Sequence, residues 1–128
     1  MTGWLGSALG VAILATAVSP AVAGPRPTDI FFRYHAAINA AQLCEGWRLE
    51  PKGYADPEWS RIAADRHRMD RVIAQKTPGE LSSTQRLGLM LSAKDISSRV
   101  IAESGCDAPR VQGWLSVFHS DLETVLAR

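Results

Sequence analysis

The sequence predicts a single all-α domain, a small antiparallel four-helix bundle with one disulfide, preceded by an N-terminal signal peptide. Four segments show helical periodicity and begin or end at residues that cap helices. No segment alternates apolar and polar residues as a half-exposed strand does. The connections are short apart from residues 49–55, which favours antiparallel neighbours.

Composition sets the first limits. The 128 residues include 14 Lys+Arg and 13 Asp+Glu, and none of these charges lies within Met1–Ala23. The rest of the chain has the charge content of a globular domain, which excludes intrinsic disorder, collagen-like repeats and a polytopic membrane protein. A net charge of +1 gives no reason to expect nucleic acid as a partner.

The first 23 residues resemble a secretory leader in their pattern. Trp4–Val18 is an apolar run of 15 residues, shorter than the roughly 20 that a bilayer-spanning helix needs. Ala21-Val22-Ala23 follows it and has small residues at the positions that signal peptidase recognises. We expect residues 1–23 to be a cleaved signal peptide, residues 24–128 to form the helical domain, and the product to be periplasmic or secreted without a stable membrane span. An uncleaved N-terminal anchor and an ordinary buried helix are the alternatives.

Cys44 and Cys106 are the two cysteines of the chain. Because disulfides persist in oxidising compartments, export favours a structural bridge between them. The alternatives are two free thiols or an intermolecular bridge.

The first two helices have clear local boundaries. The first is predicted from about Thr28, a plausible N-cap, to Trp47, with Gly46 near its end. The second is predicted to begin at Asp56-Pro57-Glu58 and to end after Gln75, where Thr77-Pro78-Gly79 follows.

The other two helices complete the bundle. The third begins between Pro78 and Ser83, where a capping-box spacing from Thr77 to Glu80 competes with a start at Ser83. It ends at Ser104-Gly105, and the fourth helix runs from Asp107-Ala108-Pro109 almost to Arg128. Up-down alternation places Cys44 and Cys106 at the same pole of the bundle.

A polar row divides the first helix. His35, Asn39 and Gln42 lie between two apolar strips, which indicates burial on two sides. The row then points into a crevice where it can bind a polar ligand, or it is the solvent-facing side of the helix, which is the expected outcome.

The second helix carries charges inside its apolar face, which is formed by Trp59, Ile62, Ala63, Met69 and Ile73. Arg66 and Asp70 project into this face one turn apart. An inward Arg66 needs Asp70 or Glu45 as its partner, or must extend to solvent. The functional alternative is an anchor for an anionic group.

The opposite side of the second helix presents Arg61, Arg68 and Arg71. Asp65 interrupts this basic row, and we expect a solvated face. Docking to phospholipid head groups or to an acidic partner is the alternative.

His35, His67 and His119 lie on three different predicted helices. The sequence contains no HxxxH, HExxH or ExxH pair of ligands, so no metal site and no cofactor are predicted. No nucleophile elbow or glycine-rich phosphate loop is present, and no catalytic residue is assigned.

These observations favour an exported, non-catalytic module for protein–protein or envelope interactions. Phe32, Leu43 and Trp47 would supply the partner surface if they are exposed. The alternative is a small-ligand or metal carrier, whose candidate binding residues are His35, Asn39, Gln42, Arg66, His67 and Asp70. The sequence indicates neither the partner nor the oligomeric state.

Overall fold

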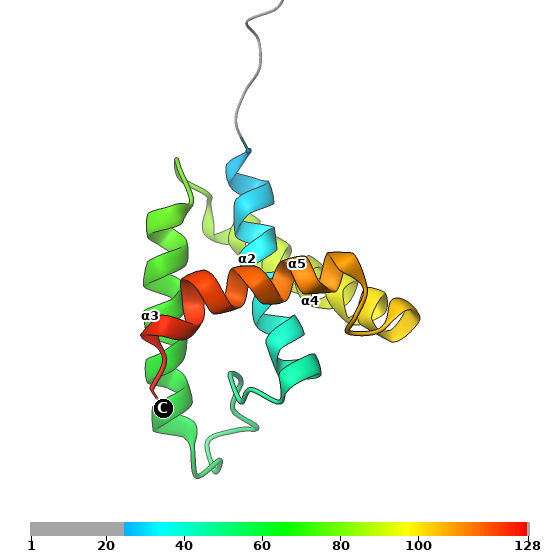
Figure 1. Cartoon of the computed structure of the whole chain (residues 1–128). Coiled ribbons are helices and arrows are strands. Elements are labelled where there is room, and N and C mark those ends of the chain that lie inside the picture. The colour runs from blue at the N-terminus through cyan, green and yellow to red at the C-terminus, as the bar shows by residue number, and fades with distance from the viewer. Residues whose placement is uncertain (1–24, 128) are drawn as a thin grey trace, which may run out of the picture.

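A computed structural model describes residues 25–127, and within this range the chain is all-helical, as predicted (Figure 1). Its α-helices are α2 (Pro27–Glu45), α3 (Trp59–Lys76), α4 (Ser83–Ser104) and α5 (Pro109–Val117). A π-helical turn (Phe118–Leu122) and a 3₁₀ turn (Glu123–Val125) continue α5. The predicted signal peptide lies outside the described residues. None of the described helices is both long and apolar enough to cross a membrane.

Two glycines end helices where the sequence predicted. Gly46 follows α2 with φ of 74°, a left-handed conformation that favours glycine, and its N–H donates to the carbonyl of Ala41. Gly105 follows α4 with φ of 84°, and its N–H donates to the carbonyl of Ile101. The C-terminal ends were predictable because the conformation that stops a helix is a local property of one residue.

The N-terminal boundaries differ from the predictions. Helix α2 begins with Pro27 at its first turn and Arg26 at its N-cap, so Thr28 is not the cap. The carboxylate of Asp56 accepts the amide of Glu58 in a turn that precedes α3, and the helix itself begins at Trp59. Neither helix has a side-chain cap; in α2 a proline occupies the first turn, where its missing N–H costs nothing, whereas Pro57 lies in the turn before α3.

Helix α4 begins with a capping box that the prediction missed. The Ser82 hydroxyl accepts the backbone N–H of Gln85 at 3.1 Å, and the Gln85 side-chain oxygen accepts the backbone N–H of Ser82 at 2.9 Å. This reciprocal pair satisfies two amides that would otherwise lack a partner. The helix starts at Ser83, which is one of the two predicted starts, and the alternative start with a capping box from Thr77 to Glu80 is wrong.

Helix α2 is the centre of the packing. It contacts α4 most extensively, then α5, and α3 least, and Figure 1 shows α5 with its continuing turns crossing α2. The C-terminal ends of α2 and α4 lie on the same side, because Asn39 contacts Ser97 and, further along, Cys44 is joined to Cys106 just after α4. Helix α3 returns in the opposite direction.

Small residues allow α2 to be covered on two sides. Its alanines 36, 37, 40 and 41 are fully buried, so the neighbouring helices approach its backbone closely. The largest fully buried apolar side chains come from the surrounding elements: Leu49, Ile62, Met69, Ile73, Val111, Phe118 and Leu122. The predicted two-sided burial of this helix is confirmed.

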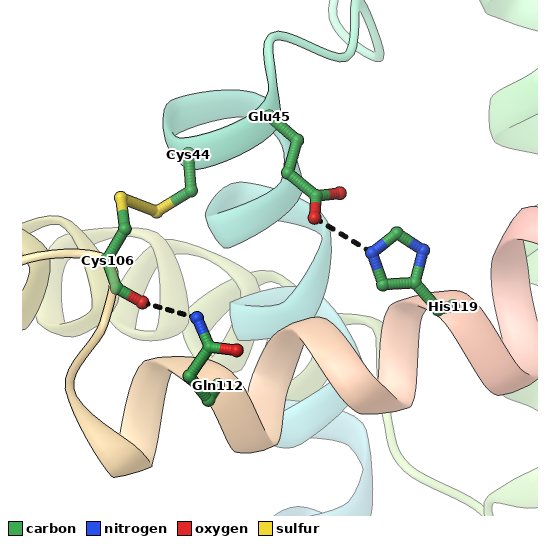
Figure 2. Close-up of a disulfide and its surroundings, with 5 residues drawn as sticks. All are labelled: Cys44, Glu45, Cys106, Gln112 and His119. Carbon is green, nitrogen blue, oxygen red and sulfur yellow. Dashed lines mark hydrogen bonds and ion pairs between the residues drawn. A yellow bond between two sulfur atoms is a disulfide. The ribbon is translucent and has the colours of Figure 1, made fainter.

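The disulfide joins Cys44 to Cys106 with a Cα–Cα distance of 5.8 Å (Figure 2). It ties the last turn of α2 to the connection between α4 and α5. The side-chain amide of Gln112 donates to the carbonyl of Cys106 at 2.8 Å and holds this connection against α5. The predicted pairing is confirmed, and neither thiol is free.

Candidate ligand-binding site

A cleft of about 560 Å³ opens between α2, α3, the connection after α3 and the start of α4. Its walls are mostly apolar and carry a few polar groups. The lining residues are Phe31, His35, Asp70, Ile73, Ala74, Thr77, Gly79, Glu80, Leu81, Arg86 and Met90. Two of the predicted site residues, His35 and Asp70, therefore meet at one cleft although they lie on different helices.

His35 lies in the α2 wall of the cleft. Only 7% of the residue is exposed, and its ring centroid is 4.5 Å from that of Phe31. Burial, together with the nearby charge of Arg66, lowers the pKa of His35 to about 4. Within residues 25–127 its imidazole makes no hydrogen bond. At neutral pH it therefore offers one donor and one acceptor to a molecule in the cleft.

Asp70 lies in the α3 wall of the same cleft. Burial raises the pKa of its carboxyl group, and the nearby Arg66 and His67 offset this only in part. Among the described residues, no side chain forms a hydrogen bond or an ion pair with Asp70. The cleft thus contains a carboxylate that lacks a direct partner.

The remaining polar groups of the cleft are Thr77, Glu80 and Arg86. The Thr77 hydroxyl donates to the carbonyl of Ile73 at 2.7 Å. Arg86 donates to the carbonyl of Leu81 at 3.0 Å and to the Ser83 hydroxyl at 3.4 Å. Both of these donors are already engaged within the protein.

The rest of the predicted polar row has a structural role. Asn39 is buried, and its side-chain amide donates to the hydroxyls of Ser97 at 2.8 Å and Ser98 at 2.9 Å. Gln42 accepts the backbone N–H of Leu49 at 3.2 Å. The expected solvent-facing side is therefore wrong for His35 and Asn39, which are buried, whereas Gln42 is partly exposed and contacts the connection after α2. Only His35 of the three faces the cleft.

Arg66 does not form the predicted pair with Asp70. Its Nη1 atom lies 3.4 Å from the carbonyl oxygen of Leu49 and 3.9 Å from a carboxylate oxygen of Glu50. Glu45, the other predicted partner, instead accepts from His119. The connection between α2 and α3 supplies the partners of Arg66, and helix periodicity alone does not place that connection. His67 is exposed on α3.

The buried acid of α3 is Asp65, which the sequence analysis placed on a solvated face. Asp65 is 1% exposed and accepts from Arg61 at 2.8 Å, from Arg68, and from the backbone N–H of Ala127 at 3.0 Å. Arg68 also donates to the carbonyl of Val125 at 2.8 Å. Arg61 and Arg68 of the basic row therefore pair with Asp65 and Arg68 also holds the C-terminal turns, whereas Arg71 is exposed, as expected. The sequence signal is an acid that shares a helix face with Ile62 and Met69 and has arginines one turn away on either side.

Two carboxylates bracket His119 on the π-helical turn. Its Nε2 atom lies 2.9 Å from Glu45, and its Nδ1 atom contacts Glu123. Figure 2 shows the Glu45 contact beside the disulfide. The three histidines do not converge, and residues 25–127 contain no group of three or more His, Cys, Asp or Glu side chains arranged to hold a metal.

The predicted partner surface is incomplete. Leu43 is 53% exposed, but Phe32 and Trp47 are partly buried against the core. Trp47 packs edge-on against Phe118 with 5.2 Å between ring centroids.

Comparison of the chain with protein-family models, curated proteins and solved structures finds no match.

Proposed function

We propose that this chain is an exported, non-catalytic helical binding domain, and that a small molecule binds in the cleft between α2, α3 and α4. The observation that carries the proposal is His35, a buried imidazole that lines the cleft without a hydrogen-bond partner among the described residues. Among the described residues no fully buried side-chain nitrogen or oxygen lacks a partner, so the ring nitrogens of His35 are accessible from the cleft, where a ligand or water can satisfy them.

The dimensions and chemistry of the cleft support binding. Its volume of about 560 Å³ lies within the range of small-molecule sites, which is roughly 300–1,000 Å³. Such sites combine apolar walls with a few polar groups that orient the ligand. Here Phe31, Ile73 and Met90 provide apolar surface, and His35 and Asp70 provide the polar groups.

The same groups are poorly suited to catalysis. A pKa of about 4 makes His35 a weak general base at neutral pH. The Thr77 hydroxyl is committed to the carbonyl of Ile73, so it is not activated by a base. These observations support a binding role for the cleft.

Export is proposed from the leader and the disulfide together. A disulfide is retained in an oxidising compartment, and the apolar leader ends in a small-residue cleavage pattern. Intact-mass measurement of protein isolated from the producing cells should show cleavage after Ala23. A retained leader would contradict the proposed processing and support an anchored form of the domain.

Filling the cleft tests the proposed function. Ala74 is exposed and lines the cleft, so Ala74→Phe should fill it without disturbing His35. Ala63→Phe, at an exposed position of α3 outside the cleft lining, is the matched control. A panel of cationic, neutral and anionic amphiphiles is screened by thermal shift. We expect at least one class to stabilise the original chain and the control but not Ala74→Phe. Stabilisation that survives in Ala74→Phe, or none at all, would contradict a ligand site here.

A protein partner is the second candidate function, and it is supported by exposed leucines on α4. Leu87 and Leu91 are 57% and 61% exposed and share one helix face. Crosslinking and co-purification from the producing cells should recover a partner that Leu87→Lys/Leu91→Lys loses. Ala102→Lys, at an exposed position of the same helix, should retain it. Equal recovery with both variants would exclude this face as the interface.

A further inference from the structure

The charges that face the cleft indicate what kind of ligand it takes. Asp70 and Glu80 both line the cleft, and neither carboxylate forms a hydrogen bond or ion pair among residues 25–127. The one cation in the lining, Arg86, already donates to Leu81 and Ser83. The lining therefore contains two carboxylates and one guanidinium, a net charge of −1, because hydrogen bonds to the neutral Leu81 and Ser83 groups leave the charge of Arg86 in place.

Nearby cations do not remove this imbalance. Arg66 influences Asp70 and His35 electrostatically, but its guanidinium contacts the carbonyl of Leu49 and the carboxylate of Glu50 and does not line the cleft. His67 is exposed on α3 and also lies outside the lining. Within the lining the two carboxylates outnumber the guanidinium of Arg86, and Arg66 acts on the cleft from outside the lining.

The buried imidazole adds a second, independent requirement. His35 is neutral at physiological pH, so one ring nitrogen accepts a hydrogen bond and the other donates one. An ammonium group is a donor only and matches both this acceptor and the Asp70 carboxylate. A carboxylate ligand would match the imidazole donor but would be repelled by Asp70 and Glu80.

Resting on the proposed function, we propose that the cleft binds an amphipathic organic amine. Its ammonium group lies against Asp70 and donates to His35, and its apolar body lies along Phe31, Ile73 and Met90. Asp70 is an exposed residue in the wall of the cleft, so the contact gains from its charge-assisted hydrogen bond and not from burial of the carboxylate.

Three soluble probes with one aromatic body and different head groups test the proposal: phenethylamine, 2-phenylethanol and 3-phenylpropionate. Their dissociation constants are measured by calorimetry on the full processed chain. Phenethylamine should bind at least about tenfold more tightly than either of the others, as expected for a charge-assisted contact.

Asp70→Asn removes the charge and keeps the shape of the side chain, so it should abolish this preference. Glu103→Gln removes an exposed charge elsewhere on α4 and should leave it intact. The amine proposal is overturned if the alcohol or the carboxylate binds as well as the amine, or if Asp70→Asn retains the preference. Binding of any probe that Ala74→Phe blocks would then still support the ligand site itself. If no probe binds, or if Ala74→Phe leaves binding unchanged, both proposals fail.

Discussion

The imidazole Nε2 atom of His119 lies 2.9 Å from a carboxylate oxygen of Glu45, so a contact between side chains joins the end of α2 to the π-helical turn. Glu123 contacts the other ring nitrogen. Hydrogen bonds to these two carboxylates raise the pKa of His119 above its ordinary value of 6.5. The protonated imidazole can donate to both acids at once.

This contact should stabilise the fold most in acid. A raised folded-state pKa gives stabilisation that is complete below the unfolded pKa and disappears as the pH rises through the folded pKa. His119→Gln should therefore lower the melting temperature more at about pH 5.5 than at about pH 8.5. His67→Gln, at an exposed histidine of α3, is the control. An equal effect of His119→Gln at both pH values would contradict the proposed charge dependence.

His35, unlike His119, should make the fold less stable as the pH falls. Its pKa is about 4 in the fold against 6.5 for an ordinary histidine, so protonation favours the unfolded chain. Stability should fall by up to about 3 kcal/mol from this group as the pH drops from 6.5 to about 4. His35→Phe should lose less stability over that interval than the original chain, as measured by urea unfolding at each pH. Parallel pH profiles for the two proteins would show that His35 is not buried in its neutral form.

Among the carboxylates of α3, Asp65 should contribute most to the free energy of unfolding. Although burial opposes its ionisation, the amide of Ala127 and the two arginines lower the pKa of Asp65 overall. Asp65→Asn should cost about 2 kcal/mol, less than a fully buried pair because both guanidiniums are partly exposed. Asp95→Asn, which breaks the exposed pair with Arg99, should cost less than about 0.5 kcal/mol. If chemical denaturation shows that Asp65→Asn and Asp95→Asn lose the same free energy of unfolding, a special role for Asp65 is contradicted.

The disulfide should contribute strongly to the free energy of unfolding. It joins residues separated by 62 positions, and the chain-entropy model gives about 4 kcal/mol for a loop of this size. The double variant Cys44→Ser/Cys106→Ser should lose most of this amount in chemical denaturation and should no longer respond to reductant. A loss below about 1 kcal/mol would mean that the reduced chain keeps α2 and α5 together by packing alone.

The helix ends that depend on a single residue were predictable from the sequence. Gly46 and Gly105 stop α2 and α4 because glycine adopts the positive φ that those ends require. The pairing of Cys44 with Cys106 followed because the chain has no other cysteines. Start positions were harder, because Thr77 to Glu80 and Ser82 to Gln85 both have the spacing of a capping box and only the second forms it.

The site was only partly predictable, and α3 shows why. Counting Trp59 and Ala63 as core residues turned the predicted buried face toward Arg66 and Asp70, but Ala63 is exposed. Without Ala63, the face defined by Ile62, Met69 and Ile73 includes Asp65. Helix periodicity groups residues onto a face, but it does not show which neighbouring segment covers that face. The C-terminal turns cover Asp65, and the cleft leaves Asp70 open.

Phenethylamine titrated into the isotopically labelled chain, followed by NMR, tests the central claim most directly. Binding in the cleft should shift the imidazole signals of His35 and the backbone signals of Asp70, Ile73 and Met90. Signals around Ala102 and the disulfide should remain unchanged. Shifts confined to other surfaces, or none at millimolar ligand, would contradict the claim that His35 and Asp70 form a binding site in this cleft.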